Sequence, residues 1–364
     1  MSDVEKNLNK TLEDLEKIGI RVTKFSSGTP ANIEVVSTGS ITLDIATGIN
    51  GFPRGRVVEV FGPEMGGKTT LSLVAIAQAQ KAGGRAAFID AEHAFSPVWA
   101  QKLGVKIDEL YFNQPDYGEQ ALDTVIKLIE TKAFDLIVID STASLTPKAE
   151  IDAEMEQQSI GLQARMMSKA LRKITAIASK SRTTVIFINQ LREKVGVMYG
   201  NPEVTPGGKA LKYYSSMRVR VDTVSKSSLE NARGDKIAHR VHVKVVKNKC
   251  AAPFREAEFL LNFETGIDND SEIFDAALSK DILKLEGRTY TYETWTAVGQ
   301  DKTRELIQTT PELKASLIEK LRTSPAGAPV TIDNEEDESP DEGEGMKIDM
   351  PKKKGKKKLE TEES

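Results

Sequence analysis

The sequence predicts an α/β fold built around a mostly parallel β-sheet that is covered by helices on both faces. Four segments carry continuous apolar runs, which are typical of strands buried on both faces. Helical patterns of spaced apolar residues separate these segments, and strands that alternate with helices favour parallel pairing. The predicted strands are at 57–61, 85–92, 136–140 and 184–190, and the clearest helical patterns are at 118–131 and 162–180.

The first segment, residues 4–18, is predicted to form a short amphipathic helix. Its apolar residues recur at steps of three and four among charged residues, so they share one stripe. The stripe can pack on its own domain or dock on a neighbouring subunit. The stretch 25–31 contains Gly and Pro and predicts a flexible link, which would permit the second arrangement. The stripe consists of Val4, Leu8, Leu12, Leu15 and Ile18.

The second half of the chain predicts added strands, a small domain and a tail. From about 215 to 263 apolar and polar residues alternate, which indicates strands at the edge of the sheet. Residues 270–322 predict a small α/β domain, and from Ala326 onward low hydrophobicity and blocks of charge predict disorder. The predicted parts are an N-terminal helix and linker (1–32), a core that contains the parallel sheet (33–268), a C-terminal domain (269–325) and a disordered charged tail (326–364).

Composition narrows the class of protein. The 364 residues are 39% hydrophobic and 29% charged, which allows a sizeable core. The single cysteine, Cys250, permits no internal disulfide and fits a reducing compartment. No apolar run has membrane-spanning length and no signal segment is recognisable, so we expect a cytoplasmic protein. The net charge of −4 arises in residues 331–364, which hold 12 acidic residues and 7 lysines, so it does not argue against nucleic-acid binding.

A glycine-rich loop between a predicted strand and a predicted helix carries the clearest chemistry. It fits the pattern G-x-x-x-x-G-K-[ST] in the context that a phosphate loop requires. Backbone N–H groups of such a loop surround phosphate oxygens, and the helix directs its positive end at them. Lys68 is expected to reach the β- and γ-phosphates, and the Thr69 hydroxyl to bind Mg²⁺. The alternative is a glycine-rich turn without a ligand. The loop comprises Gly62, Pro63, Glu64, Met65, Gly66, Gly67, Lys68, Thr69 and Thr70.

Polar residues at the ends of the other predicted strands extend this nucleotide site. Asp140 ends an apolar strand, where a carboxylate can hold the Mg²⁺ shell through water. Glu92 would lie at the same carboxyl edge of the sheet and could orient or deprotonate the attacking water, with Asp90 as its competitor. Gln190 closes the fourth strand, where its amide could read the γ-phosphate and pass its presence to the next segment.

Two irregular segments, 153–161 and 191–208, are candidate functional loops. The second contains four glycines and carries Arg192, Lys194 and Tyr199. Connections of this length are usually functional or disordered. Either segment taken alone would be interpreted as a mobile surface loop.

The sequence resembles the bacterial RecA recombinase family over a collinear span from about Ser37 to Phe263, and more weakly outside it. Several of the shared blocks are far more specific than a phosphate loop. The blocks are Ser37–Ala46, Gly62–Thr70, Phe88–Ala94, Leu145–Ile151, Gly161–Ser168, Phe187–Arg192, Met198–Glu203 and Val245–Phe254.

The resemblance implies a RecA-type P-loop NTPase core with DNA-dependent ATPase activity. Such a protein forms helical filaments on single-stranded DNA and catalyses homologous pairing and strand exchange, in recombination, DNA repair and the SOS response. The implied cofactors are ATP and Mg²⁺. The implied partners are single-stranded and double-stranded DNA, further copies of the chain, and single-strand-binding, loader or repressor proteins.

The resemblance also implies roles for individual residues. Those of the nucleotide site are Lys68, Thr69 and Asp140 for phosphate and metal, Glu92 for water activation, Gln190 for sensing the γ-phosphate, and Trp99 and Phe263 for adenine. Loops 153–161 and 191–208 correspond to the two DNA-binding loops. Those that line the single strand are Arg165, Ser168, Arg172, Gly207 and Gly208. Lys247 and Lys249 correspond to lysines that reach the ATP of the adjacent subunit, as an arginine finger does in trans.

Departures from the family pattern carry expectations of their own. Ser96 stands where the family has an acid beside the adenine amino group, which predicts relaxed base selectivity. Lys209 replaces a neutral amide and predicts stronger phosphate binding. The divergent terminal regions predict a phage-encoded or otherwise divergent member. The alternatives are a hexameric RecA-fold helicase motor, which the 191–208 loop and the Lys247/Lys249 pair disfavour, and an ATP-switched scaffold that barely hydrolyses.

Overall fold

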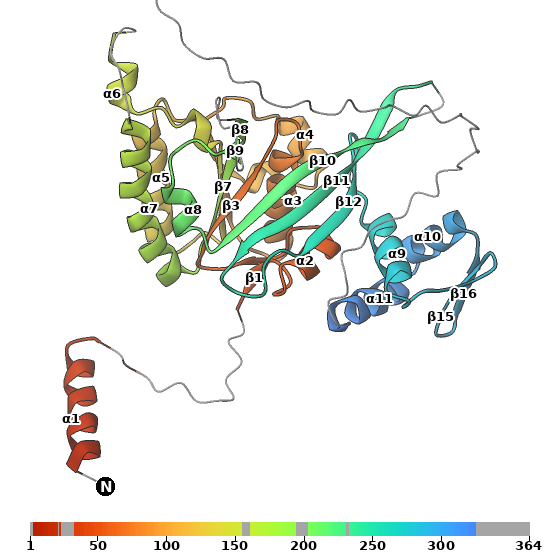
Figure 1. Ribbon diagram of the computed structural model, residues 1–364, viewed down its shortest axis with the longest axis horizontal. Coiled ribbons are helices and arrows are strands. Elements are labelled where there is room, and N and C mark those ends of the chain that lie inside the picture. Colours follow the sequence, from red (N-terminus) through yellow and green to blue (C-terminus); the bar gives the residue numbers. More distant parts are fainter. Residues whose placement is uncertain are drawn as a thin grey trace, which may run out of the picture. The chain divides into compact units, whose positions relative to one another are not determined.

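A computed structural model of the chain has a nine-stranded sheet at its centre (Figure 1). It describes residues 3–20, 22, 33–154, 161–193, 203–230 and 233–324. The strand order across the sheet is β13-β12-β11-β10-β3-β7-β6-β4-β5. These strands are β3 (Val57–Gly62), β4 (Ala86–Asp90), β5 (Tyr111–Asn113), β6 (Leu136–Asp140), β7 (Thr184–Gln190), β10 (Met217–Glu230), β11 (Lys236–Asn248), β12 (Glu256–Asn262) and β13 (Gly266–Ile267).

The pairing within this sheet confirms the predicted α/β class. Strands β10, β3, β7, β6, β4 and β5 pair in parallel, whereas β11, β12 and β13 extend the sheet by antiparallel pairs. In the parallel part Gly62 pairs with Gln190, and Asp90 pairs with Asp140. The carboxyl ends of β3, β4, β6 and β7 therefore meet at one edge, where ligands of such sheets bind.

Helices cover both faces because successive residues of each strand point to opposite sides. Leu136 and Val138 of β6 join a buried cluster with helix α3 (Lys68–Lys81). Ile137 and Ile139 of the same strand join a second cluster with α5 (Gly118–Glu130) and α7 (Leu162–Ser181). The continuous apolar runs in the sequence thus reflect burial on two faces, as predicted.

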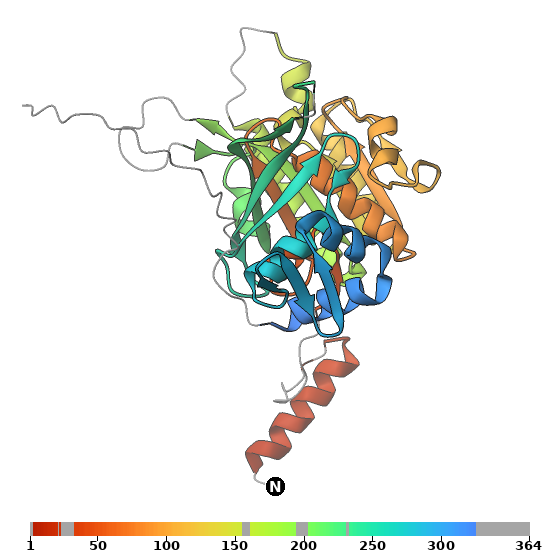
Figure 2. The same ribbon diagram turned by 90° about the vertical axis from the view of Figure 1, so that its right-hand side faces the viewer.

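The C-terminal part forms a small α/β unit, drawn in blue in Figures 1 and 2. Its three-stranded antiparallel sheet, in the order β14-β15-β16, shares a buried cluster with three helices. These elements are α9 (Asn269–Ser279), β14 (Lys284–Glu286), β15 (Thr289–Tyr292), β16 (Trp295–Val298), α10 (Gln300–Thr309) and α11 (Pro311–Thr323). Glu272 of α9 is hydrogen-bonded to the start of α2 (Ile41–Ala46) and so joins this unit to the core.

Short elements complete the described chain. Helix α1 (Asp3–Lys17) buries none of its residues within the chain, and Val4 and Leu8 of its predicted stripe are exposed. None of the described helices is both long enough and apolar enough to cross a membrane. The remaining elements are β1 (Val35–Val36), β2 (Phe52–Pro53), α4 (Pro97–Lys102), η1 (Ile107–Glu109), η2 (Thr142–Ser144), α6 (Lys148–Ile151), β8 (Arg192–Glu193), β9 (Glu203–Val204) and α8 (Ala210–Tyr214).

Several predictions fall on residues that the structure does not describe. Residues 155–160 of the first candidate DNA loop and 194–202 of the second, including Lys194 and Tyr199, lie outside the described ranges. So do most of the predicted linker after α1 and the whole tail from Ala326.

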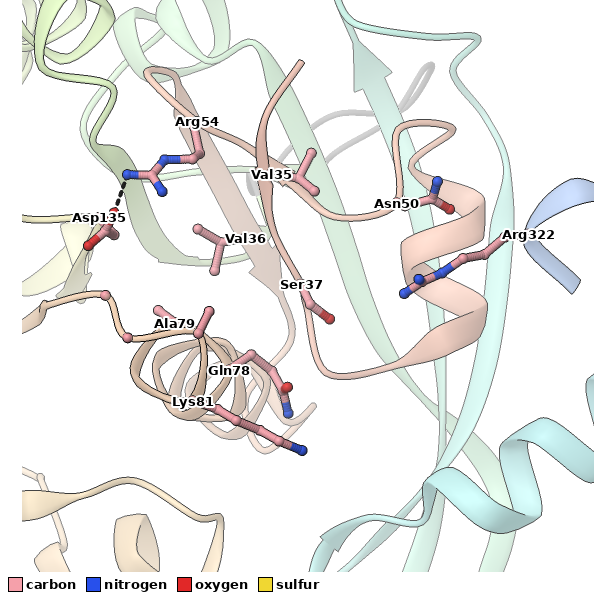
Figure 3. Close-up of a pocket in the computed structure, with 13 residues that line it drawn as sticks. Val35, Val36, Ser37, Asn50, Arg54, Gln78, Ala79, Lys81, Asp135 and Arg322 are labelled. Carbon is pink, nitrogen blue, oxygen red and sulfur yellow. Dashed lines mark hydrogen bonds and ion pairs between the residues drawn. The ribbon is translucent and has the colours of Figure 1, made fainter. Parts of the chain in front are cut away.

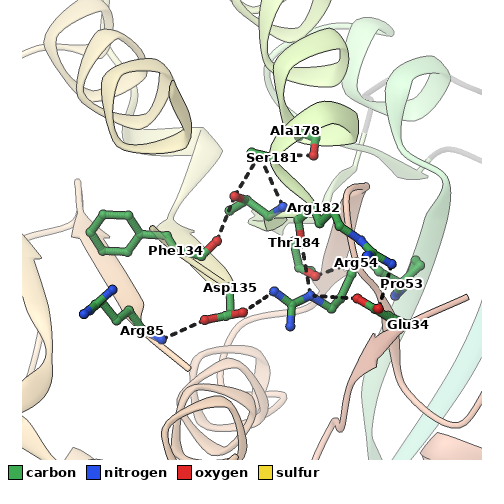
Figure 4. Close-up of polar contacts among 11 residues, drawn as sticks. Glu34, Pro53, Arg54, Arg85, Phe134, Asp135, Ala178, Ser181, Arg182 and Thr184 are labelled. Atoms are coloured by element: carbon green, nitrogen blue, oxygen red, sulfur yellow. Dashed lines mark hydrogen bonds and ion pairs between the residues drawn. The ribbon is translucent and has the colours of Figure 1, made fainter. Parts of the chain in front are cut away.

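A cavity of about 580 Å³ lies at the opposite edge of the sheet from the phosphate loop (Figure 3). Arg54 and Asp135, which line it, are joined by an ion pair, and the Asp135 carboxylate also accepts the backbone N–H of Arg85 (Figure 4). Glu34 pairs with Arg182 at 2.7 Å and lies 3.9 Å from Arg54. Asp135 immediately precedes β6, so this network closes the amino ends of the strands, and the cavity is separate from the nucleotide edge.

Candidate active site

The phosphate loop has the geometry that its sequence predicts. Strand β3 ends at Gly62 and α3 begins at Lys68. A Cβ at Gly62 would lie 2.0 Å from the carbonyl oxygen of Val221, so only glycine fits there. Gly67 adopts a φ of 92° and no side chain caps the first turn of α3, so its N–H groups remain available for an anion.

Lys68 already lies inside this loop. Its side chain is buried and its Nζ donates to the carbonyl oxygen of Pro63 at 2.5 Å. Burial lowers the pKa of Lys68, while Asp140, Glu92 and Glu64 oppose that effect because they favour the charged form. The carboxylates around the ammonium group therefore stabilise its charged form. In that form it can donate to a phosphate oxygen in place of the Pro63 carbonyl oxygen.

The two residues predicted to bind metal are in direct contact. The Thr69 hydroxyl donates to Oδ2 of Asp140 at 2.6 Å. Burial, with a further contribution from Glu92 and Asp90, raises the pKa of Asp140 to about 6, against the Thr69 hydrogen bond and Lys68. A hydroxyl and a carboxylate beside a phosphate loop are the hard oxygen ligands that Mg²⁺ prefers, so the residues present fit that ion. Its charge would favour the ionised form of Asp140.

Glu92 and Gln190, predicted separately, form one hydrogen-bonded unit. Gln190 Nε2 donates to Oε1 of Glu92 at 3.0 Å, and the same oxygen accepts the Ser141 hydroxyl at 2.5 Å. Glu92 is exposed at the carboxyl edge and can meet a water molecule. Ser141 was not predicted, although its place directly after Asp140 at a strand end is a signal that could have identified it.

Asp90, the competitor for the general base, has a structural role instead. Its carboxylate is buried and accepts the backbone N–H groups of Ala94 and Phe95 at 3.2 and 3.1 Å. It also accepts Nε2 of Gln114 at 3.0 Å. These contacts use both oxygens to hold the turn after β4, which leaves Glu92 as the carboxylate with access to solvent.

The predicted adenine residues lie on neighbouring segments. Trp99 is partly buried on α4, whose first turn is capped by the Ser96 hydroxyl at 3.3 Å from the Trp99 N–H. Phe263 follows β12 and is 42% exposed. A Cβ at Gly266 would lie 2.5 Å from Leu103 Cδ2, so the turn after Phe263 packs against the end of α4.

His239 borders the same turn and was not predicted. Its ring lies 5.2 Å from that of Phe263, centroid to centroid. Its Nε2 is buried and has no hydrogen-bond partner among the described residues, and burial lowers the pKa of this imidazole. The ring is therefore held in its neutral form beside the position where Phe263 is expected to contact adenine.

The predicted DNA residues of α7 form a basic surface. A cavity of about 470 Å³ is lined by Arg165, Ser168 and Arg172 together with Ala164, Lys169 and Lys173. The two lysines were missed because each, taken singly, is typical of a solvated helix face. Four cations on one side of a helix can follow a phosphate backbone without reading its sequence.

The end of the second candidate DNA loop packs tightly on the core. Gly207 and Gly208 have φ values of 82° and 75°. A Cβ at Gly208 would lie 2.9 Å from Ala164 Cβ on α7, so the glycines allow a close approach to the helix that carries the basic surface. Lys209 is exposed and directly precedes α8, with no side-chain hydrogen bond to the first turn, and Arg192 is exposed in β8.

Lys247 and Lys249 lie at the end of β11. Lys247 Nζ donates to the carbonyl oxygens of two residues of α8, Lys212 at 2.6 Å and Tyr213 at 3.1 Å. Burial, and then the charge of Lys249, lowers the pKa of Lys247 to about 8. The backbone N–H of Lys249 donates to Ser216, which fixes the end of the strand. Within one chain these side chains do not join the nucleotide residues.

Comparison with known proteins decides the family. A family model described as the RecA N-terminal domain matches residues 6–268. The chain belongs to the RecA family. It is 50% identical to the protein RecA of Bacteroides thetaiotaomicron over 320 residues, 87% of this chain and 96% of that one. The protein RecA of Thermus aquaticus is 50% identical over 319 residues, 87% of this chain and 93% of that one.

These RecA alignments extend well past the span 37–263 over which the resemblance is strong in the sequence itself. Most of the flanking segments therefore align with relatives as well. A solved structure described as the crystal structure of the RadB recombinase aligns with a TM-score of 0.49 at 24% identity, covering 64% of this chain and 98% of that one.

Proposed function

We propose that this RecA-family chain is a DNA-dependent ATPase and homologous recombinase that forms helical filaments on single-stranded DNA. Within those filaments it pairs homologous duplex DNA and exchanges strands. The observation that carries the proposal is the 3.0 Å contact between Gln190 and Glu92. It joins the carboxylate placed to activate water to the residue directly before the 191–208 segment, so the hydrolytic site and the proposed DNA loop are connected by a hydrogen bond.

The nucleotide site follows from the described contacts. The free N–H groups of the phosphate loop and the Lys68 ammonium bind the phosphates of ATP. Thr69 and Asp140 hold Mg²⁺, which supplies positive charge to the phosphate oxygens. Glu92 orients the attacking water and accepts its proton, while the Ser141 hydroxyl fixes the carboxylate. Trp99 and Phe263 enclose the adenine.

Gln190 acts as the γ-phosphate sensor. Its amide donates to Glu92 in this structure, and a γ-phosphate would offer stronger, charged acceptors to the same donor. Transfer of this hydrogen bond would shift the strand end and the segment behind it. The second DNA loop thereby adopts its binding conformation only when ATP is present.

Single-stranded DNA binds along α7 and the returning end of the second loop. Arg165 and Arg172 contact phosphates, Ser168 lies between them, and Gly207 and Gly208 allow the backbone to approach the strand. Lys209 adds a further phosphate contact. We also expect Arg192, Lys194 and Tyr199 of the 191–208 segment, and segment 153–161, to bind DNA.

Assembly completes the site. Helix α1 exposes its apolar stripe and docks it on the adjacent subunit, which makes residues 1–32 an oligomerisation segment. Lys247 and Lys249 reach the ATP of that neighbour. A head-to-tail interface of this kind does not close on itself and gives a helical filament. The hexameric helicase alternative is not favoured, because the relatives are RecA proteins that align over most of their length.

The cellular role follows from membership of this family. We place the protein in the cytoplasm, in recombination, DNA repair and the SOS response. Single-strand-binding, loader and repressor proteins are its expected partners.

ATP turnover with and without single-stranded DNA tests the proposal, using Lys68→Ala and the matched control Lys81→Ala at the other end of α3. We expect DNA-stimulated turnover in the unmodified chain and in the control, and a loss of about 100-fold or more in Lys68→Ala, because a charge aimed at the transferring phosphoryl group is removed. ATP turnover that does not increase with DNA, or that persists in Lys68→Ala, would refute the assignment of a DNA-dependent ATPase site at the phosphate loop. Strand exchange between homologous duplex and single strands, measured with ATP, completes the test.

A further inference from the structure

Gln163 is the second residue of α7 and lies just after the first candidate DNA loop. Its side-chain amide contacts two segments far from it in the sequence. Nε2 donates to the carbonyl oxygens of Thr142 at 3.0 Å and Leu145 at 3.2 Å. Oε1 accepts the backbone N–H of Gly207 at 3.1 Å. One amide therefore bridges the turn after β6 and the returning end of the second DNA loop.

The turn after β6 belongs to the hydrolytic site. Asp140, Ser141 and Thr142 are consecutive, and the first two contact Thr69 and Glu92. Any shift of the Thr142 carbonyl therefore accompanies a shift of the residues that hold metal and base. The Gln163 side-chain amide donates directly to this carbonyl oxygen, with no intervening side chain.

The loop backbone at Gly207, the second partner of the Gln163 amide, is closely packed. A Cβ at Gly207 would lie 3.0 Å from Thr142 Cγ2, so the backbone of the loop is packed against the same turn. The preceding residue, Pro206, is held independently by Asn189 Nδ2 at 3.3 Å. Asn189 is buried next to the sensor Gln190, and its Nδ2 also donates to Glu59 at 3.1 Å. The returning loop thus has two amide anchors, one on β7 and one on α7.

We propose that Gln163 is a positioning residue that couples the nucleotide site to the second DNA loop. The inference rests on the proposed function and adds a specific mechanical link to it. An amide suits this place because it offers donors and an acceptor on one rigid plane. Methionine has a similar length and offers neither, whereas glutamate keeps an acceptor for Gly207 but sets a charge against the Thr142 and Leu145 carbonyls.

The coupling can be measured as a ratio of affinities. Single-stranded DNA is titrated by fluorescence anisotropy in the presence and absence of a non-hydrolysable ATP analogue, and the ratio of midpoints gives the coupling factor. The analogue is also titrated without DNA. A purely structural role would lower both DNA affinities, or the melting temperature, and leave the ratio unchanged.

The variants are Gln163→Met, Gln163→Glu and the control Gln308→Met, which changes an exposed glutamine on α10. We expect the coupling factor to fall about fivefold or more in both Gln163 variants, while analogue affinity without DNA stays within about twofold. Gln308→Met should match the unmodified chain. If Gln163→Met fails to fold, as judged by circular dichroism, Gln163→Glu decides the question.

An unchanged coupling factor in a folded Gln163 variant overturns the inference and leaves the proposed function intact. A parallel loss of analogue affinity and DNA affinity, with the ratio preserved, also overturns it. If the analogue does not change the DNA affinity of the unmodified chain, the proposed function is refuted, and the inference that rests on it is refuted as well.

Discussion

Glu272 makes the stability of this protein depend on pH in a direction opposite to that of most acidic residues. Its side chain is buried at the junction between α9 and the start of α2. It accepts the hydroxyls of Ser40 and Thr42 at 2.5 Å each and the backbone N–H groups of Ile41 and Thr42 at 3.1 and 2.9 Å. Burial nevertheless raises the pKa of Glu272 from 4.5 to about 7, because the loss of solvation outweighs these hydrogen bonds, which act to lower it.

The sign follows from proton binding. Between pH 4.5 and about 7 the folded state holds a proton on Glu272 that the unfolded chain has released. The contribution of this group to the free energy of unfolding is therefore complete below pH 4.5 and is lost as the pH rises through 7. At about 1.4 kcal/mol for each pKa unit, the whole change is about 3 kcal/mol.

Urea unfolding of Glu272→Gln across this range isolates the effect, with Glu286→Gln on the exposed strand β14 as the control. The free energy of unfolding of the unmodified chain, minus that of Glu272→Gln, should fall by about 3 kcal/mol between pH 4.5 and pH 8. The same difference for Glu286→Gln should stay flat. Asp44, whose pKa burial raises to about 6, is present in every variant and cancels in the comparison. A difference that rises with pH, or that does not change, would refute the reasoning.

Two further predictions concern catalysis. Glu92→Gln should leave binding of an ATP analogue unchanged but slow hydrolysis by about 100-fold or more, because the base is lost while the Ser141 and Gln190 contacts keep an oxygen acceptor; equal losses of binding and turnover would contradict this. Lys249→Ala should lose DNA-stimulated turnover, since a cation supplied in trans contributes about 10³-fold or more, and mixing it with Lys68→Ala should restore part of the activity at mixed interfaces. A mixture no more active than its components would argue against catalysis between subunits.

The sequence predicts the sheet and its active edge because local pattern and topology act together there. Residues 136–139 and 185–188 are apolar throughout, and the structure buries them on both faces. Parallel pairing then brings the carboxyl ends to one edge, so residues such as Glu92 and Gln190 could be placed together without any knowledge of their contacts.

Contacts between loops produce no pattern in the sequence from which they could be predicted. Gln163 is one polar residue at the start of an amphipathic helix, and nothing in its spacing indicates that its amide meets Gly207. Glu272 and Ser40 are separated by 232 positions and belong to different parts of the chain. Asp90 likewise binds backbone N–H groups instead of facing solvent because of the conformation of the turn after β4. The pattern of apolar residues does not predict that conformation.

Two partners would compete for the Lys247 ammonium group. They are the carbonyl oxygens of α8 in the same chain and, in the proposed filament, the ATP of the neighbouring subunit. With a pKa of about 8, Lys247 is charged at neutral pH and donates to the last carbonyls of α8, which is favourable at the negative end of a helix. Helix α8 begins directly after Gly208 and Lys209, so it is continuous with the returning end of the second DNA loop. For Lys247 to reach the ATP of a neighbour it must release these carbonyls. In the proposed filament, the movement that completes the neighbour's active site would therefore free these carbonyls of α8. Nucleotide binding at one subunit and loop conformation at the next would then be linked through α8, in addition to the proposed link through Gln190 within each chain.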